Sequence, residues 1–122
     1  MPYTSICTEL FGHKRAWGTL KGMGCSFVLT SYIRGITLDH STVVVDEAQN
    51  LTFHELDSIV TRLGIGSRLV LCGDTAQSDI RDSGLDKMLN ILSPLISVTT
   101  FAAADIVRSS FVREYIIRRD SM

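Results

Sequence analysis

The chain has 122 residues, of which 45% are hydrophobic and 20% are charged, and its 12 basic and 13 acidic residues give a formal net charge of −1. This length allows one domain, and the ordinary hydrophobic fraction excludes a disordered chain and a disulfide-dependent scaffold. The balanced charge excludes a global basic field that would recruit nucleic acid or an anionic membrane, so any such binding would have to be local.

The first half of the chain is predicted to contain two strands. Residues 5–11 are compatible with a helical turn, and residues 13–24, which are rich in Gly and Lys, are predicted to form a loop. Strands are then predicted at residues 26–30 and 42–46. Both are continuously apolar, a pattern typical of parallel strands that are covered on both faces.

Helices are predicted to alternate with the later strands. In residues 52–63, apolar side chains recur at helical spacing, Thr52 and Glu55 form a capping box, and Gly64 is expected to end the helix. The following elements are a strand at 68–72, a helix from 83 or 84 to 92, a strand at 96–101 and a helix at 110–118. This order predicts an α/β fold with a three-layer, mostly parallel sheet.

The apolar faces of the last two helices can also be predicted. Leu85, Met88, Leu89 and Leu92 share one face of the first, and we expect Phe111, Val112, Tyr115 and Ile116 to face inward from the second. The three cysteines, Cys7, Cys25 and Cys72, have no C-x-x-C spacing, which favours reduced core thiols over a zinc site.

The location of the protein is also predicted from the sequence. No apolar run approaches the about 18 residues of a membrane span, and Glu9 near the N-terminus argues against a signal peptide. We therefore expect a soluble, cytoplasmic protein with no membrane partner.

Two of the predicted strands end in polar motifs. The strand at 42–46 runs into the Asp46-Glu47 pair, and the strand at 68–72 runs into a turn that contains Asp74 and Gln77. Ligands of open α/β sheets collect at the carboxyl ends of strands, so we expect these motifs to lie close together. An isolated Asp-Glu could instead only cap the next helix. The two motifs together predict a Walker B pair and its partner sensor.

Each residue type in these motifs suits one role in phosphoryl transfer. Asp46 is expected to hold Mg²⁺ through water, and Glu47 to orient and polarise the attacking water. Gln77 would hydrogen-bond the γ-phosphate or that water, because a carboxamide both donates and accepts. Asp74 is expected to buttress the turn that aims Gln77, as part of the nucleotide-binding group.

Three arginines are candidate cations for this site. We assign Arg34 to the nucleotide-binding group. Arg62, near a helix end, is expected to be solvated or matched to the helix dipole. Arg108 could reach a γ-phosphate, with a structural pairing to Asp105 as the alternative. The three histidines lack ligand spacing and are expected on the surface or in loops.

No phosphate-binding glycine loop accompanies these motifs. A Walker A loop reads Gly-x-x-x-x-Gly-Lys-Ser/Thr, whereas Gly12 and Gly18 have five residues between them and are followed by Thr19. The amides and the Lys of such a loop supply most of the affinity for a triphosphate. We therefore expect the isolated chain to bind ATP weakly or not at all.

Six motifs resemble, in order and spacing, the second half of PhoH-like proteins, which are P-loop ATPases related to the core of superfamily 1 helicases. The motifs are Ser31–Leu38, Val45–Asn50, Val60–Gly64, Gly73–Asp79, Ser83–Leu85 and Asp105–Ser109. The resemblance implies ATP and Mg²⁺ as cofactors, with Asp46 and Glu47 as the Walker B pair and Gln77 as the motif-III glutamine. It also implies that Arg108 lies near nucleotide, in a neighbouring subunit if the protein forms a ring.

The resemblance implies that residues 1–122 are a partial PhoH-like ATPase domain, an incomplete P-loop NTPase fold. We expect an ATP-binding protein or ATPase fragment, linked to RNA or DNA processing in a phage or bacterium and inactive as an isolated chain. Its Walker A would come from elsewhere, through a homo-oligomer or a second chain that supplies the P-loop. The alternative is a non-catalytic binding or assembly module that keeps the sheet and pairs through its exposed edge.

Overall fold

A pair of parallel strands organises the first of the chain's two units. The computed structural model describes residues 3–77 and 83–122, and it divides the chain into residues 1–85 and 86–122. The elements are α1 (Thr4–Phe11), α2 (Ala16–Gly22), η1 (Thr30–Tyr32), β1 (Thr42–Val45), η2 (Ala48–Asn50), α3 (Phe53–Val60), β2 (Arg68–Leu71), η3 (Thr75–Gln77), α4 (Leu85–Leu92), η4 (Ala103–Asp105) and α5 (Ser110–Asp120).

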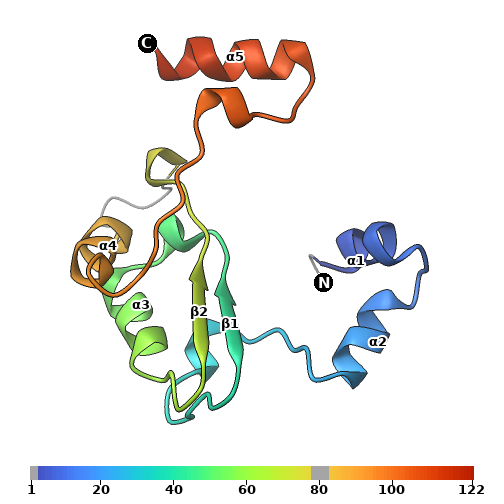
Figure 1. Cartoon of the computed structure of the whole chain (residues 1–122), viewed down its shortest axis with the longest axis vertical. Helices are drawn as coiled ribbons and strands as arrows, with labels where there is room; N and C mark the ends of the chain where they lie inside the picture. The colour runs from blue at the N-terminus through green and yellow to red at the C-terminus, as the bar shows by residue number, and fades with distance from the viewer. Residues whose placement is uncertain (1–2, 78–82) are drawn as a thin grey trace. The chain divides into compact units, whose positions relative to one another are not determined.

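The sheet confirms the predicted α/β class and the parallel pairing. β1 pairs with β2 so that Thr42 lies opposite Arg68 and Val45 opposite Leu71. Parallel strands need a crossover connection, and α3, which runs beside the two strands in Figure 1, lies within that connection. The described residues form two strands, so the three-layer P-loop arrangement stays a prediction.

Two predicted strands do not form. Residues 26–29 lie outside any helix or strand and are followed by η1, which begins at Thr30, and residues 96–101 lie outside any strand. Most of their apolar side chains are exposed, and Phe101 reaches 81%. A β-branched segment becomes a strand only when a neighbour satisfies its backbone groups, and no described segment pairs with either range.

β1 and β2 are covered on one face, so the predicted cover on both faces is wrong for the described residues. Val45 is buried, whereas Val44 and Val70 are 60% and 44% exposed. Successive strand side chains point to opposite faces, and the described residues leave the face of Val44 and Val70 open. A continuously apolar strand therefore presents apolar surface here.

The start of α3 follows the prediction, but its end does not. Thr52 Oγ1 accepts from the Glu55 amide at 3.2 Å, and the Glu55 carboxylate accepts from the Thr52 amide at 2.9 Å, which confirms the capping box. The helix ends at Val60, not at Gly64. The Gly64 amide instead donates to the Leu38 carbonyl at 2.8 Å, extending the strand pairing toward the amino end.

The N-terminal region is more helical than predicted. α1 confirms the helical turn, but α2 forms within the residues predicted to be a loop. Cys7 is buried in α1, whereas Cys25 and Cys72 are exposed, so the core-thiol prediction is confirmed only for Cys7. Cys72 lies directly after β2, at the carboxyl end of the strand.

The second unit, residues 86–122, contains η4, α5 and most of α4. Leu85, Met88 and Leu92 are buried, which confirms three positions of the predicted face of α4, and Leu89 is half-buried. The inward orientation of Phe111 and Tyr115 is wrong, because both side chains are exposed and α5 has no buried residue. Among the described helices, none has the length and apolar character needed to cross a membrane.

Candidate functional site

The Asp46-Glu47 pair forms a sharp turn at the carboxyl end of β1. Asp46 Oδ1 accepts a hydrogen bond from the Glu47 amide at 3.0 Å. Glu47 has φ 52° and ψ 39°, the left-handed region that residues other than glycine rarely adopt. Such a conformation persists only where its surroundings hold it, and it recurs at functional sites. The turn exposes two adjacent carboxylates, and each of them has its own hydrogen-bond partners.

The carboxyl ends of the two strands lie side by side. The Cys72 amide donates to the Val45 carbonyl at 2.8 Å, and the Ala48 amide donates to the Cys72 carbonyl at 2.9 Å. These bonds continue the ladder past β1 and β2. The Asp46-Glu47 turn and the Gly73-Asp74 turn are therefore neighbours in space, as the sequence predicts.

Gln49 connects the two turns through a buried amide. Its side chain is 2% exposed. Its Nε2 donates to Glu47 Oε2 at 2.5 Å, and its Oε1 accepts from the Asp74 amide at 3.0 Å. One side chain thus orients the Glu47 carboxylate and fixes the start of the second turn. The sequence predicts no role for Gln49, although its place in the Val45–Asn50 motif is a signal.

The second turn depends on a glycine and an aspartate. A Cβ on Gly73 would lie 2.9 Å from Leu85 Cδ2 and 3.0 Å from Gln49 Oε1, so a larger residue would crowd the bridging amide. Asp74 Oδ1 accepts from the Ala76 amide at 2.9 Å, which buttresses the turn that leads to Gln77. The side chain of Gln77 lies outside the described part of the structure, so its contact with phosphate or water stays a prediction.

Tyr3 reaches the acidic turn from the amino end of α1. Its Oη donates to Asp46 Oδ2 at 2.7 Å, and its ring centroid lies 6.0 Å from that of Phe27. The hydrogen bond to Asp46 raises the pKa of Tyr3, with further increases from burial and from the charges of Asp46, Cys72 and Glu47. Tyr3 was not among the residues predicted for the site, because no local signal relates two residues 43 positions apart.

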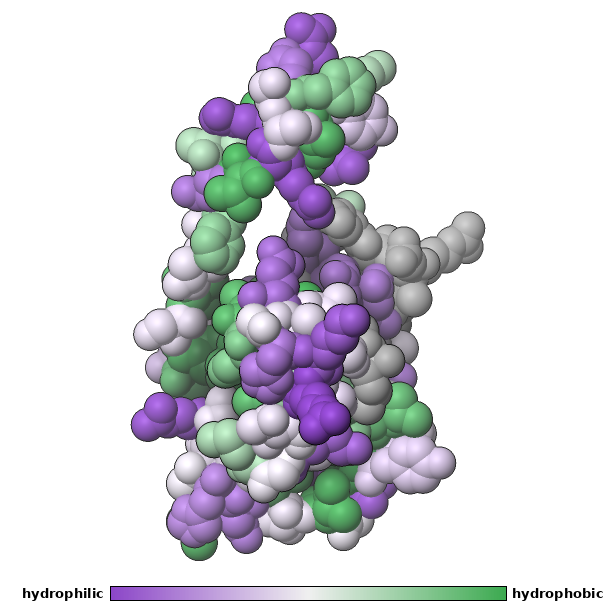
Figure 2. Space-filling model, turned by 90° about the vertical axis from the view of Figure 1, so that its right-hand side faces the viewer, coloured by the Kyte–Doolittle hydropathy of each residue, from purple (hydrophilic) through white to green (hydrophobic). Residues whose placement is uncertain are grey.

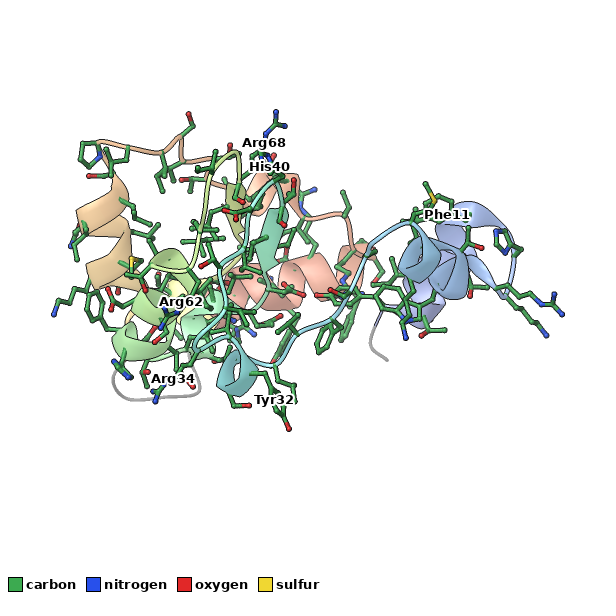
Figure 3. All side chains as sticks on the ribbon, turned by 90° about the horizontal axis from the view of Figure 1, so that it is seen from below. Phe11, Tyr32, Arg34, His40, Arg62 and Arg68 are labelled. Atoms are coloured by element: carbon green, nitrogen blue, oxygen red, sulfur yellow. The ribbon has the colours of Figure 1, made fainter. Side chains whose placement is uncertain are left out.

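Arg34 lies against α3, as Figure 3 shows, and contacts His54 instead of the acidic turn. Its Nη2 lies 2.9 Å from His54 Nε2. The described residues show no hydrogen bond or ion pair from Arg34 to Asp46 or Glu47. Arg34 lines a cavity of about 280 Å³, whose other lining residues are Thr30, Ser31, Glu55 and Ser58. The nucleotide role of Arg34 stays a prediction.

The other two candidate arginines differ in their surroundings. Arg62 is half-buried, and its Nε is buried with no hydrogen-bond partner in the described residues, so the side chain is not fully solvated, and its match to the helix dipole stays a prediction. Arg108 is exposed in the second unit. No ion pair between Arg108 and Asp105 occurs in the described chain, and Asp105 instead accepts from the Ala102 amide at 2.7 Å. A nucleotide contact of Arg108 stays a prediction.

The acidic turn offers exposed carboxylates to a magnesium ion held through water, and this role stays a prediction. Within residues 3–77 and 83–122, no cluster of three or more His, Cys, Asp or Glu side chains could hold a metal directly. Mg²⁺ keeps several waters and uses one or two carboxylates together with substrate phosphates. Asp46 is exposed and oriented by donors on both oxygens, which suits this mode.

Comparison with known proteins gives a consistent match. A family model described as PhoH-like protein matches residues 3–118. A PhoH-like protein of Mycobacterium leprae is 40% identical over 91 residues, which are 70% of this chain and 26% of that protein. A PhoH-like protein of Synechocystis is 37% identical over 91 residues, with 70% of this chain and 28% of that protein covered. Protein PhoH2 of Bacillus subtilis is 49% identical over 49 residues, which are 40% of this chain and 11% of that protein.

Proposed function

The chain belongs to the PhoH-like family, and from this premise we propose that it supplies the metal and water side of a Mg²⁺–ATP site. It spans about a quarter of the length of the PhoH-like relatives described above. One observation carries the proposal: the Gln49 amide bonds both to the Glu47 carboxylate and to the backbone of Asp74. Two acid-bearing strand ends that share a buried amide suit a single ligand at that edge.

The residues of the turn divide the work between the metal and the water. Asp46 would hold hydrated Mg²⁺, which supplies neutralisation of charge on the phosphate oxygens. Glu47 would orient a water and accept its proton, and the Gln49 bond to Oε2 leaves Oε1 for that water. Gln77 would sense the γ-phosphate, and Arg108 would stabilise charge on the γ-phosphate bound to a neighbouring subunit if the protein forms a ring.

A complete site needs a phosphate-binding loop that residues 1–122 do not contain. We propose that a second polypeptide segment supplies it, in a hetero-complex or an oligomer, and that the assembly acts in RNA or DNA processing. The exposed Val44 and Val70 face of the sheet supports such an assembly. Figure 2 shows hydrophobic side chains interspersed with hydrophilic ones on the face that it displays.

Binding of a fluorescent ATP analogue tests this proposal. The chain alone should bind it weakly, and a mixture with a polypeptide that carries the family's phosphate-binding loop should bind it more tightly when Mg²⁺ is present. Asp46→Asn should remove the Mg²⁺ dependence, whereas Asp86→Asn on the exposed surface of α4 should not. Equal Mg²⁺ dependence in both variants would contradict the assignment of Asp46.

A non-catalytic assembly module is the second candidate function. The observation that favours it is the same open sheet face, since continuously apolar strands leave Val44 and Val70 exposed. Failure of every mixture to bind nucleotide, together with stable self-association of the chain, would favour this candidate.

A further inference from the structure

Tyr3 makes a long-range hydrogen bond at the candidate site. Its hydroxyl donates to Asp46 Oδ2 at 2.7 Å across 43 positions of sequence. The other carboxylate oxygen, Oδ1, accepts from the Glu47 amide at 3.0 Å. With one donor on each oxygen, rotation of the carboxylate about its Cβ–Cγ bond would break at least one hydrogen bond.

The ring of Tyr3 is itself held in place. It packs at 6.0 Å between centroids and at 51° to the ring of Phe27, in the tilted arrangement that aromatic pairs favour. The residue is half-buried, so its hydroxyl lies at the boundary between the chain and solvent. Loss of the hydroxyl alone would leave the aromatic contact intact.

We propose that Tyr3 is a positioning residue that holds the Asp46 carboxylate in the orientation in which it binds hydrated Mg²⁺. This inference rests on the proposed function, because it assumes that Asp46 faces the metal. Each carboxylate oxygen has two lone pairs, so an oxygen that accepts one hydrogen bond can still accept another from a metal-bound water. Partners of a metal-site carboxylate commonly set its orientation and its affinity.

A purely structural role for Tyr3 is the competing explanation. In that case the hydroxyl would only tie the start of α1 to the end of β1, and its removal would change stability without changing metal binding. The two explanations therefore differ in what Tyr3→Phe does to the metal when the fold is unchanged.

Paramagnetic Mn²⁺, used as a probe for Mg²⁺, can measure this difference by NMR on the whole chain. Mn²⁺ should broaden the amide signals of Glu47 and Ala48 in the wild-type chain. Tyr3→Phe should need roughly tenfold more Mn²⁺ for the same broadening. Tyr115→Phe is the matched control, because Tyr115 is exposed in the second unit, and it should leave the midpoint unchanged. The carbon-13 shift of the Asp46 carboxyl group, measured without metal, should also move in Tyr3→Phe and not in Tyr115→Phe.

The Asp46→Asn variant separates failure of this inference from failure of the proposed function. If Asp46→Asn abolishes the broadening but Tyr3→Phe keeps the wild-type midpoint, the positioning role is wrong and the metal assignment stands. If Asp46→Asn broadens as the wild type does, the metal assignment itself is wrong. A loss of amide dispersion in Tyr3→Phe would also overturn the inference, because Tyr3 would then be needed for the fold.

Discussion

Among single residues, Gln49 shows how a buried polar group can organise a site. Its amide is 2% exposed and serves one partner in each of the two turns. A buried amide is favourable only when its donors and acceptors are used, and here both ends of the side chain are used. The same contacts orient the Glu47 carboxylate, as its proposed water-positioning role requires.

Replacing this amide by an apolar side chain of similar size should destabilise the fold. In Gln49→Leu the Asp74 amide loses its acceptor, so we expect the free energy of unfolding to fall by about 1–3 kcal/mol. Urea denaturation followed by circular dichroism measures this change. Asn90→Leu on the exposed surface of α4 is the control, expected within about 0.5 kcal/mol of the wild type. Equal losses in both variants would contradict a bridging role for Gln49.

The contact of Tyr3 with Asp46 should make stability depend on alkaline pH. The pKa of Tyr3 is raised in the folded chain from the ordinary 10.0, chiefly by the hydrogen bond to Asp46. A raised folded pKa contributes stability that is fully present below the unfolded pKa and is lost as the pH rises through the folded value. The groups that raise the pKa of Tyr3 electrostatically are Asp46, Cys72 and Glu47.

Site-specific NMR of the Tyr3 ring across the alkaline range tests this linkage. In Asp46→Asn the carboxylate charge is absent, so the pKa of Tyr3 should fall back toward 10.0. An unchanged titration of Tyr3 in that variant would show that the two side chains do not interact in solution.

Among the helices and their connections, a glycine fixes how the chain meets the start of α3. The Gly84 amide donates to the Leu51 carbonyl at 3.1 Å, and a Cβ at this position would lie 2.0 Å from the Phe53 backbone nitrogen. Backbone atoms at a capped helix start cannot move aside as a flexible side chain can. The close approach therefore requires glycine for a steric reason.

Two alanine substitutions should have opposite effects on stability. Gly84→Ala should lower the free energy of unfolding by about 1–3 kcal/mol, the range for overpacking. Gly18→Ala is the contrasting case, because Gly18 lies inside α2 and a Cβ there would meet no neighbouring atom within 4 Å. Alanine at this position should stabilise the helix by about 0.5–1 kcal/mol. Thermal unfolding of both variants gives the sign of each change in stability. A Gly84→Ala variant as stable as the wild type would contradict the packing described.

For the molecule as a whole, the sequence predicts those features of the fold that depend on residues close together in the chain. The α3 cap formed by Thr52 and Glu55 and the parallel pairing of β1 and β2 follow from short-range patterns, and the structure confirms them. Residues 26–30 and 96–101 contain apolar and β-branched side chains like the strands that form, but a strand also needs a partner, and sequence periodicity does not show one. The contact between Tyr3 and Asp46 depends on the tertiary fold and could not be read from either motif.

For the site residues too, positions set by the strand pattern could be predicted, whereas positions set by the tertiary fold could not. The neighbouring positions of Asp46, Glu47 and Asp74 could be predicted because carboxyl ends of adjacent parallel strands meet at one edge. The placement of Arg34 beside His54 depends on the path of the chain between α2 and β1. This connection is mostly irregular, so no periodic pattern in the sequence predicts its path.

The proposed function requires that the Asp46-Glu47 turn performs the water chemistry of ATP hydrolysis once a phosphate-binding loop is supplied. This requirement is tested by the rate of ATP turnover when the chain is mixed with a polypeptide that carries the loop. The wild type is compared with Glu47→Gln and with Glu114→Gln on the exposed surface of α5. We predict that Glu47→Gln lowers turnover by about 100-fold or more and that Glu114→Gln leaves it unchanged. Turnover of equal rate in the wild type and in Glu47→Gln would contradict the role of Glu47 and, with it, the proposed chemistry of the turn.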